Sequence, residues 1–530
     1  MTTRSLAIGG TSYPLILPSI RDPRLHVAGV IISIHVLGQF GLDFAVSVPQ
    51  ILAAILTAAV IEIALTFRQT RSFVWPASAM LTGSGVALIM RVVGTSSDDP
   101  WSFLGWYVFA GVAAFSLLTK YVIKYRGSHV FNPSNVGLVV AFVVLGSTRI
   151  EPLDFWWSPL NVWMVAAYTI IIGGGLLITR RLHLLEMAGT FWVAIAAGLA
   201  ILAASGHCMT ANWSFTPVCG VDYWRVIVTS PELLIFLFFM ITDPKTVPAG
   251  RVGRVVFAIL VAAVSTMLMA PQTDEWGTKV GLLSGLVLVC AARPLLERFL
   301  PEPRSAADDL RRFASRLVTG GSPSPGFLRV AARGGLIVLA VFALGAGIVA
   351  AGTPSRGLVA VDTEEILNRV PHQVDPTTFP PITVSQDVSD WDHEIQGAGA
   401  QAVVLTLGEN LELENQALLR GDGSILVAVD HGDRLADMEA RLAEAGTTGE
   451  TTIAHYTFDS MDMSLIEPFG VQTGLSLGLA ATGTVTTETY DDAGTLTSTA
   501  TEPFDLTFVM RRATGDRWLN VGVLPAGASD

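Results

Sequence analysis

The sequence predicts a polytopic α-helical membrane protein with about eleven transmembrane helices, followed by a soluble α+β domain. Two observations predict this class. Mean hydropathy is +0.52 and only 15% of the residues are charged, well below the level typical of soluble domains. Apolar blocks of helical length recur as far as residue 352, and beyond it the 530-residue chain becomes acidic and polar. We therefore expect a membrane part and a separate C-terminal domain.

The individual membrane spans follow from the apolar blocks. A span needs about 20 mostly apolar residues, because its backbone groups must bond within the helix where no water is available. The blocks predicted to span are 25–43, 47–67, 74–95, 103–123, 134–148, 160–179, 185–204, 223–242, 254–270, 277–297 and 334–352.

The loops between these blocks alternate in charge, and this alternation orients the chain. One set of loops is basic, from Arg4, Arg21 and Arg24 at the start to the Arg298–Arg333 group at the end, whereas the opposite set is largely acidic. The positive-inside rule places basic loops in the cytoplasm. We therefore expect a multi-pass protein of the cell membrane with a cytoplasmic N-terminus and an extracytoplasmic C-terminal domain.

Five segments are expected along the chain: a membrane domain (1–300), a cytoplasmic amphipathic linker (301–332), a final transmembrane helix (333–352), an extracytoplasmic linker (353–395) and an extracytoplasmic α+β domain (396–530). Within the linker, Ser305–Leu317 predicts a basic amphipathic helix on the membrane surface. In the last domain we expect a strand or helix start at 400–407, helices at 412–419 and 434–445, and strands at 451–458, 473–490, 494–512 and 518–523.

Two of the three cysteines lie in one predicted outer loop. Cys208 and Cys219 are there, whereas Cys290 lies in an apolar block. Because an outer loop faces an oxidising compartment, a Cys208–Cys219 disulfide is expected, with two free thiols as the alternative.

Three segments interrupt the apolar pattern with Gly, Pro, Asn or Asp near the cytoplasmic side. They are Pro76–Gly83, Val130–Gly137 and Phe238–Pro248. One interpretation is that Asn132, Thr242 and Asp243 cap helix ends while the prolines start or stop helices. The other is that converging amides and helix ends hold an anionic or polar planar ligand.

The same segments carry a resemblance to a family. Ser78-Ala-Met-Leu-Thr-Gly83, Phe131-Asn-Pro133 and Phe238-Phe-Met-Ile-Thr-Asp-Pro-Lys-Thr246 resemble, in order and spacing, the D subunit of the Rnf electron-transport complex and the B subunit of the sodium-pumping NADH:quinone oxidoreductase, with their relatives in enediyne biosynthesis clusters. The resemblance covers roughly residues 20–300. It implies a membrane electron-transport subunit with a flavin, FMN or riboflavin, and partner subunits of a membrane redox complex.

The resemblance also implies a set of flavin-binding residues. They are Thr82, Gly83, Phe131, Asn132, Pro133, Thr242, Asp243, Pro244 and Thr246. The Ser/Thr-Gly-Ala-Thr sequence that carries covalent FMN in the family is missing here, so a flavin is expected to bind non-covalently.

Charged residues within spans are costly unless they are paired or hydrated. We expect Arg91 to reach toward Asp98 and Asp99, and Glu62 to pair with Arg68 or Arg71. Glu232 sits near the middle of its span. It is the best candidate for a proton-coupled or ligand-binding carboxyl, with a buried structural hydrogen bond as the alternative.

The C-terminal domain resembles the cone of nuclear-transport-factor-like domains, on Ala417–Asp422, Phe504–Phe508 and Trp518. Such a cone implies an enclosed pocket or a bound extracytoplasmic protein. Alternative functions are a small-metabolite exporter on the same scaffold and a non-catalytic anchor that presents this domain. The net charge of −12 and the lack of a basic stripe argue against nucleic acid as a partner, so membrane lipid is the expected surrounding.

Overall fold

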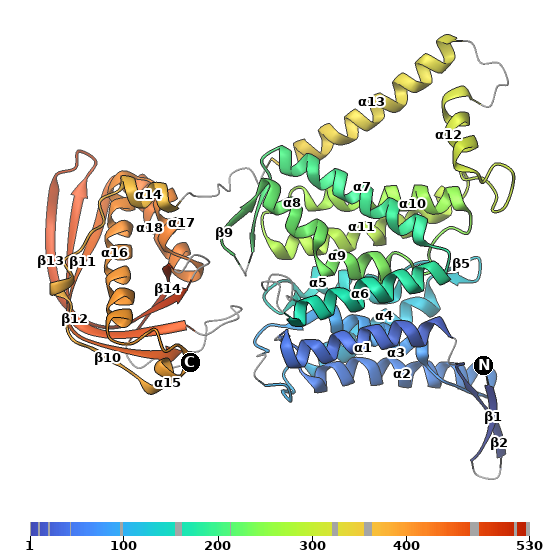
Figure 1. Cartoon of the computed structure of the whole chain (residues 1–530), viewed down its shortest axis with the longest axis horizontal. Coiled ribbons are helices and arrows are strands. Elements are labelled where there is room, and N and C mark those ends of the chain that lie inside the picture. Colours follow the sequence, from blue (N-terminus) through green and yellow to red (C-terminus); the bar gives the residue numbers. More distant parts are fainter. Residues whose placement is uncertain are drawn as a thin grey trace. The chain divides into compact units, whose positions relative to one another are not determined.

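The computed structural model describes residues 2–8, 11–19, 22–42, 44–95, 99–153, 162–211, 214–320, 327–353, 363–466, 476–512 and 517–525. The chain divides into two compact units (Figure 1). The helical unit comprises residues 1–209 and 219–358. The C-terminal unit comprises residues 359–530 with the short segment 210–218.

The helical unit is built mainly from helices that run between its two ends. Its helices are α1 (Pro23–Gly41), α2 (Val48–Thr70), α3 (Ala77–Ile89), α4 (Trp106–Val122), α5 (Pro133–Leu145), α6 (Val162–Arg181), α7 (Leu185–Ala204), α8 (Gly220–Thr229), α9 (Pro231–Ile235), the π-helix η1 (Phe236–Met240), α10 (Arg251–Met269), α11 (Glu275–Leu296), α12 (Leu310–Thr319) and α13 (Phe327–Ala351).

Seven helices of the described chain are long and apolar enough to cross a membrane: α1, α2, α6, α7, α10, α11 and the 330–351 part of α13. The consecutive helices α8 to η1 make an eighth crossing if they form one bent span, with a bend of 41°. Three shorter apolar helices, α3, α4 and α5, occupy the other predicted spans. By length and composition the described residues thus contain seven or eight candidate membrane spans, against about eleven predicted.

The helical unit consists of two halves with the same packing order. In the first half α2 packs against α3 and α4, and α4 packs against α5. In the second half α7 packs against α8 and α10, and α10 packs against α11. The first half begins at one end of the bundle and the second half, starting with α6, begins at the opposite end (Figure 1). The halves meet where α1 packs on α6 and α5 packs on α11.

The two short helices of the first half stop inside the bundle. Helices α3 and α5 have 13 residues each, about 20 Å, which is less than the hydrocarbon thickness of a bilayer. After them the chain continues as strands β4 (Met90–Val92) and β7 (Ile150–Pro152), which pair with each other in antiparallel fashion. This pairing satisfies backbone groups that would otherwise lack partners at this depth.

The corresponding span of the second half is broken rather than short. Ser230 separates α8 from α9, and its hydroxyl accepts a hydrogen bond from the Leu233 backbone N–H. Pro231 takes the first position of α9, where its missing N–H costs nothing. The span then widens into the π-helix η1, a form that is frequent at functional sites.

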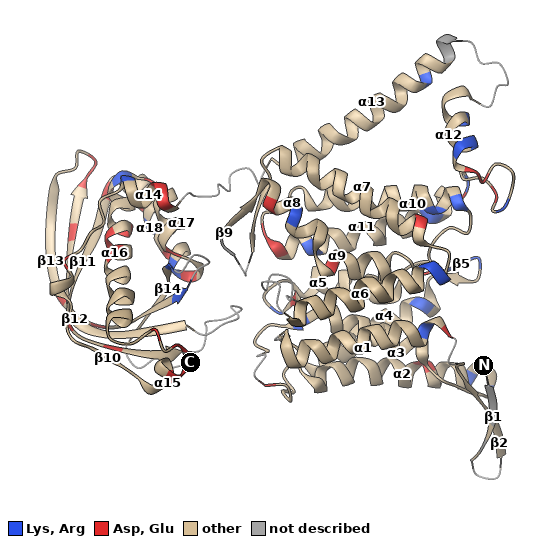
Figure 2. Ribbon diagram, in the orientation of Figure 1, with Lys and Arg blue, Asp and Glu red and all other residues tan. Residues whose placement is uncertain are grey.

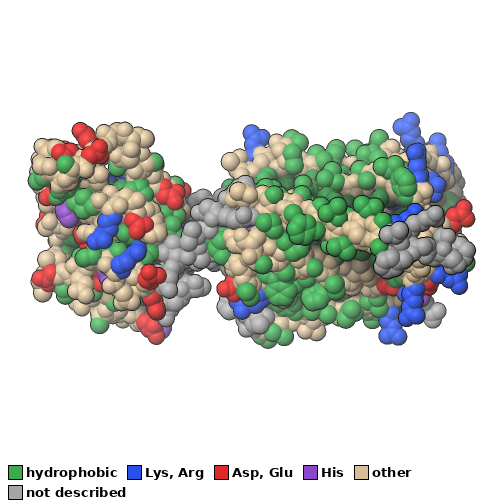
Figure 3. Space-filling model, turned by 90° about the horizontal axis from the view of Figure 1, so that it is seen from above, with side chains coloured by type: hydrophobic (Ala, Val, Ile, Leu, Met, Phe, Trp, Pro, Cys, Tyr) green, Lys and Arg blue, Asp and Glu red, His purple; other side chains and the backbone are tan. Residues whose placement is uncertain are grey.

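Side-chain types on the helical unit fit a bilayer. On the face shown in Figure 3, apolar side chains cover its broad middle. Lys and Arg gather at the end that carries α12, β5 (Lys124–Tyr125) and the N-terminus (Figure 2). Also at this end, β1 (Thr2–Ile8) and β2 (Thr11–Leu17) form a hairpin, and β2 pairs in parallel with β3 (Phe73–Val74). The sequence analysis did not predict this hairpin.

The C-terminal unit is an α+β domain, as predicted. Its sheet has the order β10 (Ile382–Val384), β11 (Glu450–Ile466), β12 (Ser476–Asp491), β13 (Leu496–Arg512), β14 (Trp518–Pro525), with β10 parallel to β11 and the other pairs antiparallel. The predicted turn at 491–494 joins β12 to β13. The predicted turn at 514–516 lies outside the described residues.

Helices cover this sheet. The long helix α16 (Ala398–Arg420) packs on β11 and β14 and includes both the segment left open as strand or helix and the predicted helix 412–419. Helices α17 (Gly423–Val429) and α18 (Gly432–Thr448) follow it. The domain begins before residue 396, because α14 (Thr363–Arg369), α15 (Gln386–Trp391) and β10 lie in the segment predicted to be a linker.

Candidate functional site

A cavity lies between the two halves of the helical unit, where the broken and shortened elements meet. It encloses about 460 Å³ of space between its lining atoms, including the part open to the exterior. We call it the inter-half cavity. Its lining residues are Leu88, Ile89, Pro152, Leu153, Glu232, Ile235, Phe236, Met240, Lys279, Leu282 and Leu283. The lining is apolar apart from one carboxylate and one ammonium group.

Those two charged groups form an ion pair. Glu232 stands in the first turn of α9, directly after the helix break, and its Oε1 lies 3.0 Å from Lys279 Nζ on α11. The same ammonium group lies 2.6 Å from Glu275 Oε1, one turn earlier on α11. One buried cation therefore faces two carboxylates at the wall of the cavity. The Glu232 carboxylate that the sequence analysis singled out is therefore paired with a cation, which it shares with Glu275.

Two asparagines tie the opposite part of the cavity wall together. Asn132 Nδ2 donates to the backbone carbonyl of Met240, at 3.1 Å. Asn135 Nδ2 donates to the backbone carbonyl of Leu283, at 3.0 Å. Both acceptor residues line the cavity, so the start of α5 holds η1 and α11 in place around it. Asn132 also caps α5, because its Oδ1 accepts from the Asn135 N–H.

Asp243 and His129 form a second link between the same two segments. Asp243 Oδ2 lies 3.1 Å from His129 Nε2, just before the Asn132 cap. Asp243 Oδ1 accepts from the backbone N–H of Lys245, which closes the turn after η1. The second and third segments of the sequence analysis, which lie more than 100 residues apart in the chain, therefore contact each other.

The first segment joins this arrangement through the helix that it opens. Thr82 donates to the carbonyl of Ser78 in its own helix, and Gly83 packs directly on α2. Two residues later Gly85 faces Ser134 of α5, since a Cβ placed on it would lie 3.2 Å from Ser134 Oγ. The end of the same helix, Leu88 and Ile89, lines the cavity.

The remaining predicted site residues have local roles. Thr242 donates to the carbonyl of Phe238 and Thr246 to that of Asp243. Pro133 starts α5, Phe131 is half-buried beside the Asn132 cap, and Pro244 is exposed. None of the nine residues predicted to bind flavin is itself a lining residue of the inter-half cavity. The predicted site lies behind the cavity wall and supports it.

The pairing expectations for the other buried charges need correction. Glu62 pairs with Lys120 of α4, at 3.0 Å, rather than with Arg68 or Arg71 at its own helix end. Arg91 of β4 pairs with Glu151, the residue opposite it on β7. Of the two expected partners, Asp98 lies outside the described residues, and Asp99 accepts a hydrogen bond from the Trp101 backbone N–H. Lys120 and Glu151 are both far from their partners in sequence. At these depths in the bundle an opposite charge is supplied by another element, through a tertiary contact.

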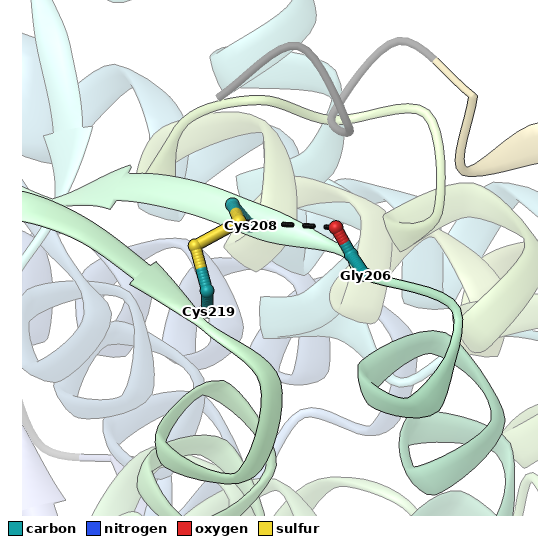
Figure 4. The surroundings of a disulfide bond; sticks show 3 residues. All are labelled: Gly206, Cys208 and Cys219. Carbon is teal, nitrogen blue, oxygen red and sulfur yellow. Dashed lines mark hydrogen bonds between the residues drawn. A yellow bond between two sulfur atoms is a disulfide. The ribbon is translucent and has the colours of Figure 1, made fainter. Parts of the chain in front are cut away.

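The predicted disulfide is present. Cys208 and Cys219 are bonded at the base of a hairpin formed by β8 (Cys208–Ala211) and β9 (Ser214–Cys219) (Figure 4). Cys290 is a buried free cysteine on α11. The disulfide fixes the chain at the start of α8, the 10-residue helix that leads to the break.

Sequence reasoning missed several residues of this region. Four residues hold the cavity wall together, yet the sequence analysis singled out none of them: Lys279, Glu275, Asn135 and His129. Lys279 carried a usable signal, since it is a charge inside a predicted span, four residues after Glu275. Asn135 and His129 lie beside the Phe131-Asn-Pro133 motif but outside its matching letters.

The fold and the cavity define a helical membrane protein of two similarly packed halves that enclose a largely apolar site containing one ion pair. A comparison with protein-family models gives no match, and a search of curated proteins finds no similar protein.

Proposed function

We propose that this chain is a membrane component of an electron-transport complex of the Rnf type, and that the inter-half cavity holds a flavin without a covalent bond. One observation carries the proposal. The third segment that resembles the Rnf family lines this cavity through Met240, and the second holds Met240 through the Asn132 side chain. The first lies in α3, whose last residues, Leu88 and Ile89, line the cavity.

The cavity suits the chemistry of a flavin, FMN or riboflavin. Its apolar lining with one polar pair fits a flat ring with polar edges. Phe236 would contact the ring face, and the Lys279 ammonium would hydrogen-bond a ring carbonyl. A bound flavin accepts and donates electrons one or two at a time. The protein would exclude water and hold the ring beside the Lys279 ammonium, which it shares with Glu232 and Glu275.

The proposal includes an orientation in the cell membrane. We take the end rich in Lys and Arg as cytoplasmic, so the N-terminus is inside and the C-terminal unit is extracytoplasmic (Figure 2). Helices α3, α4 and α5 then complete about eleven crossings, because the loops at their two ends belong to opposite charge classes. The C-terminal unit would bind an extracytoplasmic partner protein, and other redox proteins of the complex would contact the membrane part.

Filling the cavity tests the proposal. Leu282 is buried in its wall, whereas Leu288 lies on the same helix and is 53% exposed toward the surroundings. We expect Leu282→Trp to lose bound flavin and the control Leu288→Trp to keep it. Equal flavin content in both variants, each folded and inserted, would contradict a flavin in this cavity.

A second candidate function is transport of a small solute or ion on the same scaffold. The buried Glu232–Lys279–Glu275 group beside a broken helix favours it, since such features commonly line transport sites. In proteoliposomes, Glu232→Gln would then reduce solute or proton flux while Asp222→Asn, an exposed change on α8, would not. Flux that is indifferent to Glu232→Gln excludes this carboxylate as the transport group.

A further inference from the structure

A second cluster of buried charged groups lies in the C-terminal unit, independent of the cavity. Its carboxylates are Glu414 on α16 and Asp430 at the end of α17, which are 3% and 0% exposed. Arg434 on α18 donates to both oxygens of Glu414, with Nε at 2.9 Å from Oε1. Asn520 on β14 donates to the same Oε1, at 2.8 Å. Glu414 therefore accepts two hydrogen bonds at Oε1 and one at Oε2, which leaves acceptor capacity at Oε2.

The Asp430 carboxylate, in contrast, lacks hydrogen-bond donors among the described residues. Both of its carboxylate oxygens are buried, and neither accepts a hydrogen bond from the described residues. Its backbone is fixed on two sides: its N–H donates to the carbonyl of Leu426, and residue 430 forms a bridge with Asn520. The side chain thus cannot turn to solvent without moving α17. A carboxylate held in this way carries an uncompensated charge, whereas a carboxylic acid could donate its proton to Glu414.

We propose that Asp430 and Glu414 together bind one proton, and that this proton closes the contact between α17, α16 and β14. The C-terminal unit would then open more readily as the solution becomes alkaline. Proton binding here is a property of this domain and does not depend on a flavin or on transport in the helical unit.

The pH dependence of this contact follows from the pKa of Asp430. Burial and the neighbouring Glu414 charge raise that pKa well above its ordinary value, while Arg434 and Asn520 act in the opposite direction. A folded-state pKa above the unfolded one means that the folded protein binds the proton more tightly. The resulting stability is complete below the unfolded pKa, about 3.9, and is lost as pH rises through the raised pKa.

The other groups packed around the pair keep one charge state between pH 5 and pH 9. They are Arg434, Tyr456 on β11, and His431 beside Asp430 with Arg511 of β13. Burial lowers the pKa of His431 to about 4, and burial raises the pKa of Tyr456. Arginines remain charged at these pH values. The titration in this range therefore belongs to the Asp430–Glu414 pair.

The test uses the full-length protein with a cysteine reporter at Ala428, which is 2% exposed on α17. Labelling of Ala428→Cys reports opening of this helix, since Cys208 and Cys219 are bonded and Cys290 is buried. The labelling rate of Ala428→Cys is measured in protein that retains Asp430 and in protein that also carries Asp430→Asn. The asparagine amide keeps the shape of the aspartate side chain and can donate a hydrogen bond to Glu414. The ratio of the two rates at each pH removes the intrinsic pH dependence of thiol labelling.

We expect the ratio of the Asp430-containing rate to the Asp430→Asn rate to be smallest at pH 5 and to rise by at least about tenfold by pH 9, since one unit of pKa shift corresponds to a factor of ten. Asp437→Asn, an exposed change on α18, should leave the ratio flat. A ratio that stays constant with pH, or faster labelling of Asp430→Asn at every pH, would overturn the proposal.

Infrared spectroscopy provides a second measurement if the reporter variant does not fold. Compared with Asp430→Asn, the unmodified protein should show a protonated carboxyl stretch at pH 5 that disappears as the pH rises. Absence of that band between pH 5 and pH 7 would also overturn the proposal.

Discussion

Among the described residues that line the inter-half cavity, Lys279 is the one cation, and it pairs with both Glu232 and Glu275. The sequence analysis found Glu232 because a charge near the middle of an apolar block stands out. Its partner could not be predicted, because the pair joins α9 to α11 across the bundle. The same reason explains the wrong partners expected for Glu62. The position of a charged residue within a span can be predicted from one sequence. Its ion-pair partner cannot, because the partner depends on how the helices pack.

Removing the Lys279 ammonium tests the importance of this group. In Lys279→Met two carboxylates would be left buried without their cation, so we expect a loss of about 3–5 kcal/mol in stability. Arg225→Met breaks an exposed ion pair with Asp222 and should cost at most about 1 kcal/mol. Thermal unfolding in detergent compares the two variants. Similar midpoints would show that the buried cluster contributes no more than a surface pair.

Asp243→Asn separates the two interpretations of the Thr242–Asp243 turn. If Asp243 and His129 support the bound flavin, removing the carboxylate charge should cost about 1.5–3 kcal/mol of flavin affinity, roughly tenfold or more. If Asp243 only closes a turn, about 1 kcal/mol of stability is lost and flavin binding is unchanged. Flavin titration of the purified variant decides between them. Asp309→Asn, which removes only the cap of α12, is the matched control.

Among the elements, the apolar blocks predicted where helices lie but not where they stop. Block 74–95 was predicted to be one full span, yet helix α3 ends at Ile89. The residues that follow α3, Met90–Val92, are partly apolar and continue the pattern, so hydropathy alone does not reveal the change to a strand. The β4–β7 pairing depends on two segments that lie about 60 residues apart.

Close packing of α3 on α2 gives a prediction at this scale. A Cβ on Gly83 would lie 2.4 Å from the backbone oxygen of Ala54, and backbone cannot move aside cheaply. We expect Gly83→Ala to lose about 1–3 kcal/mol of stability. Gly111 on α4 has open space around it, so Gly111→Ala should be neutral or stabilise by up to about 1 kcal/mol. If both glycine variants melted at the same temperature, the close α2–α3 contact would be refuted.

At the scale of the whole chain, composition predicted a membrane part and a C-terminal α+β domain. The alternating pattern of β11 to β14 and the helical pattern of α18 were readable because each repeats over many residues. The two-half organisation was not predicted, since the packing order of helices carries no sequence repeat that we detected. The start of the C-terminal domain was placed too late, because α14, α15 and β10 are short and polar.

The orientation is tested by cysteine accessibility in intact cells. Glu439→Cys is exposed on α18, and Arg312→Cys is exposed on α12. With a cytoplasmic N-terminus and an extracytoplasmic C-terminal unit, an impermeant thiol reagent should label the first and not the second until the cells are opened. Labelling of position 312 in intact cells, with position 439 protected, would reverse the topology.

The flavin content of the purified protein is the most direct measurement of the central proposal. The protein is expressed with riboflavin, purified in mild detergent, and examined by absorption spectroscopy before and after acid denaturation. We expect a flavin spectrum that bleaches on chemical reduction, a ratio approaching one flavin per chain, and complete release of the flavin on denaturation because the bond is non-covalent. A folded, membrane-inserted protein without stoichiometric flavin would contradict the electron-transport proposal.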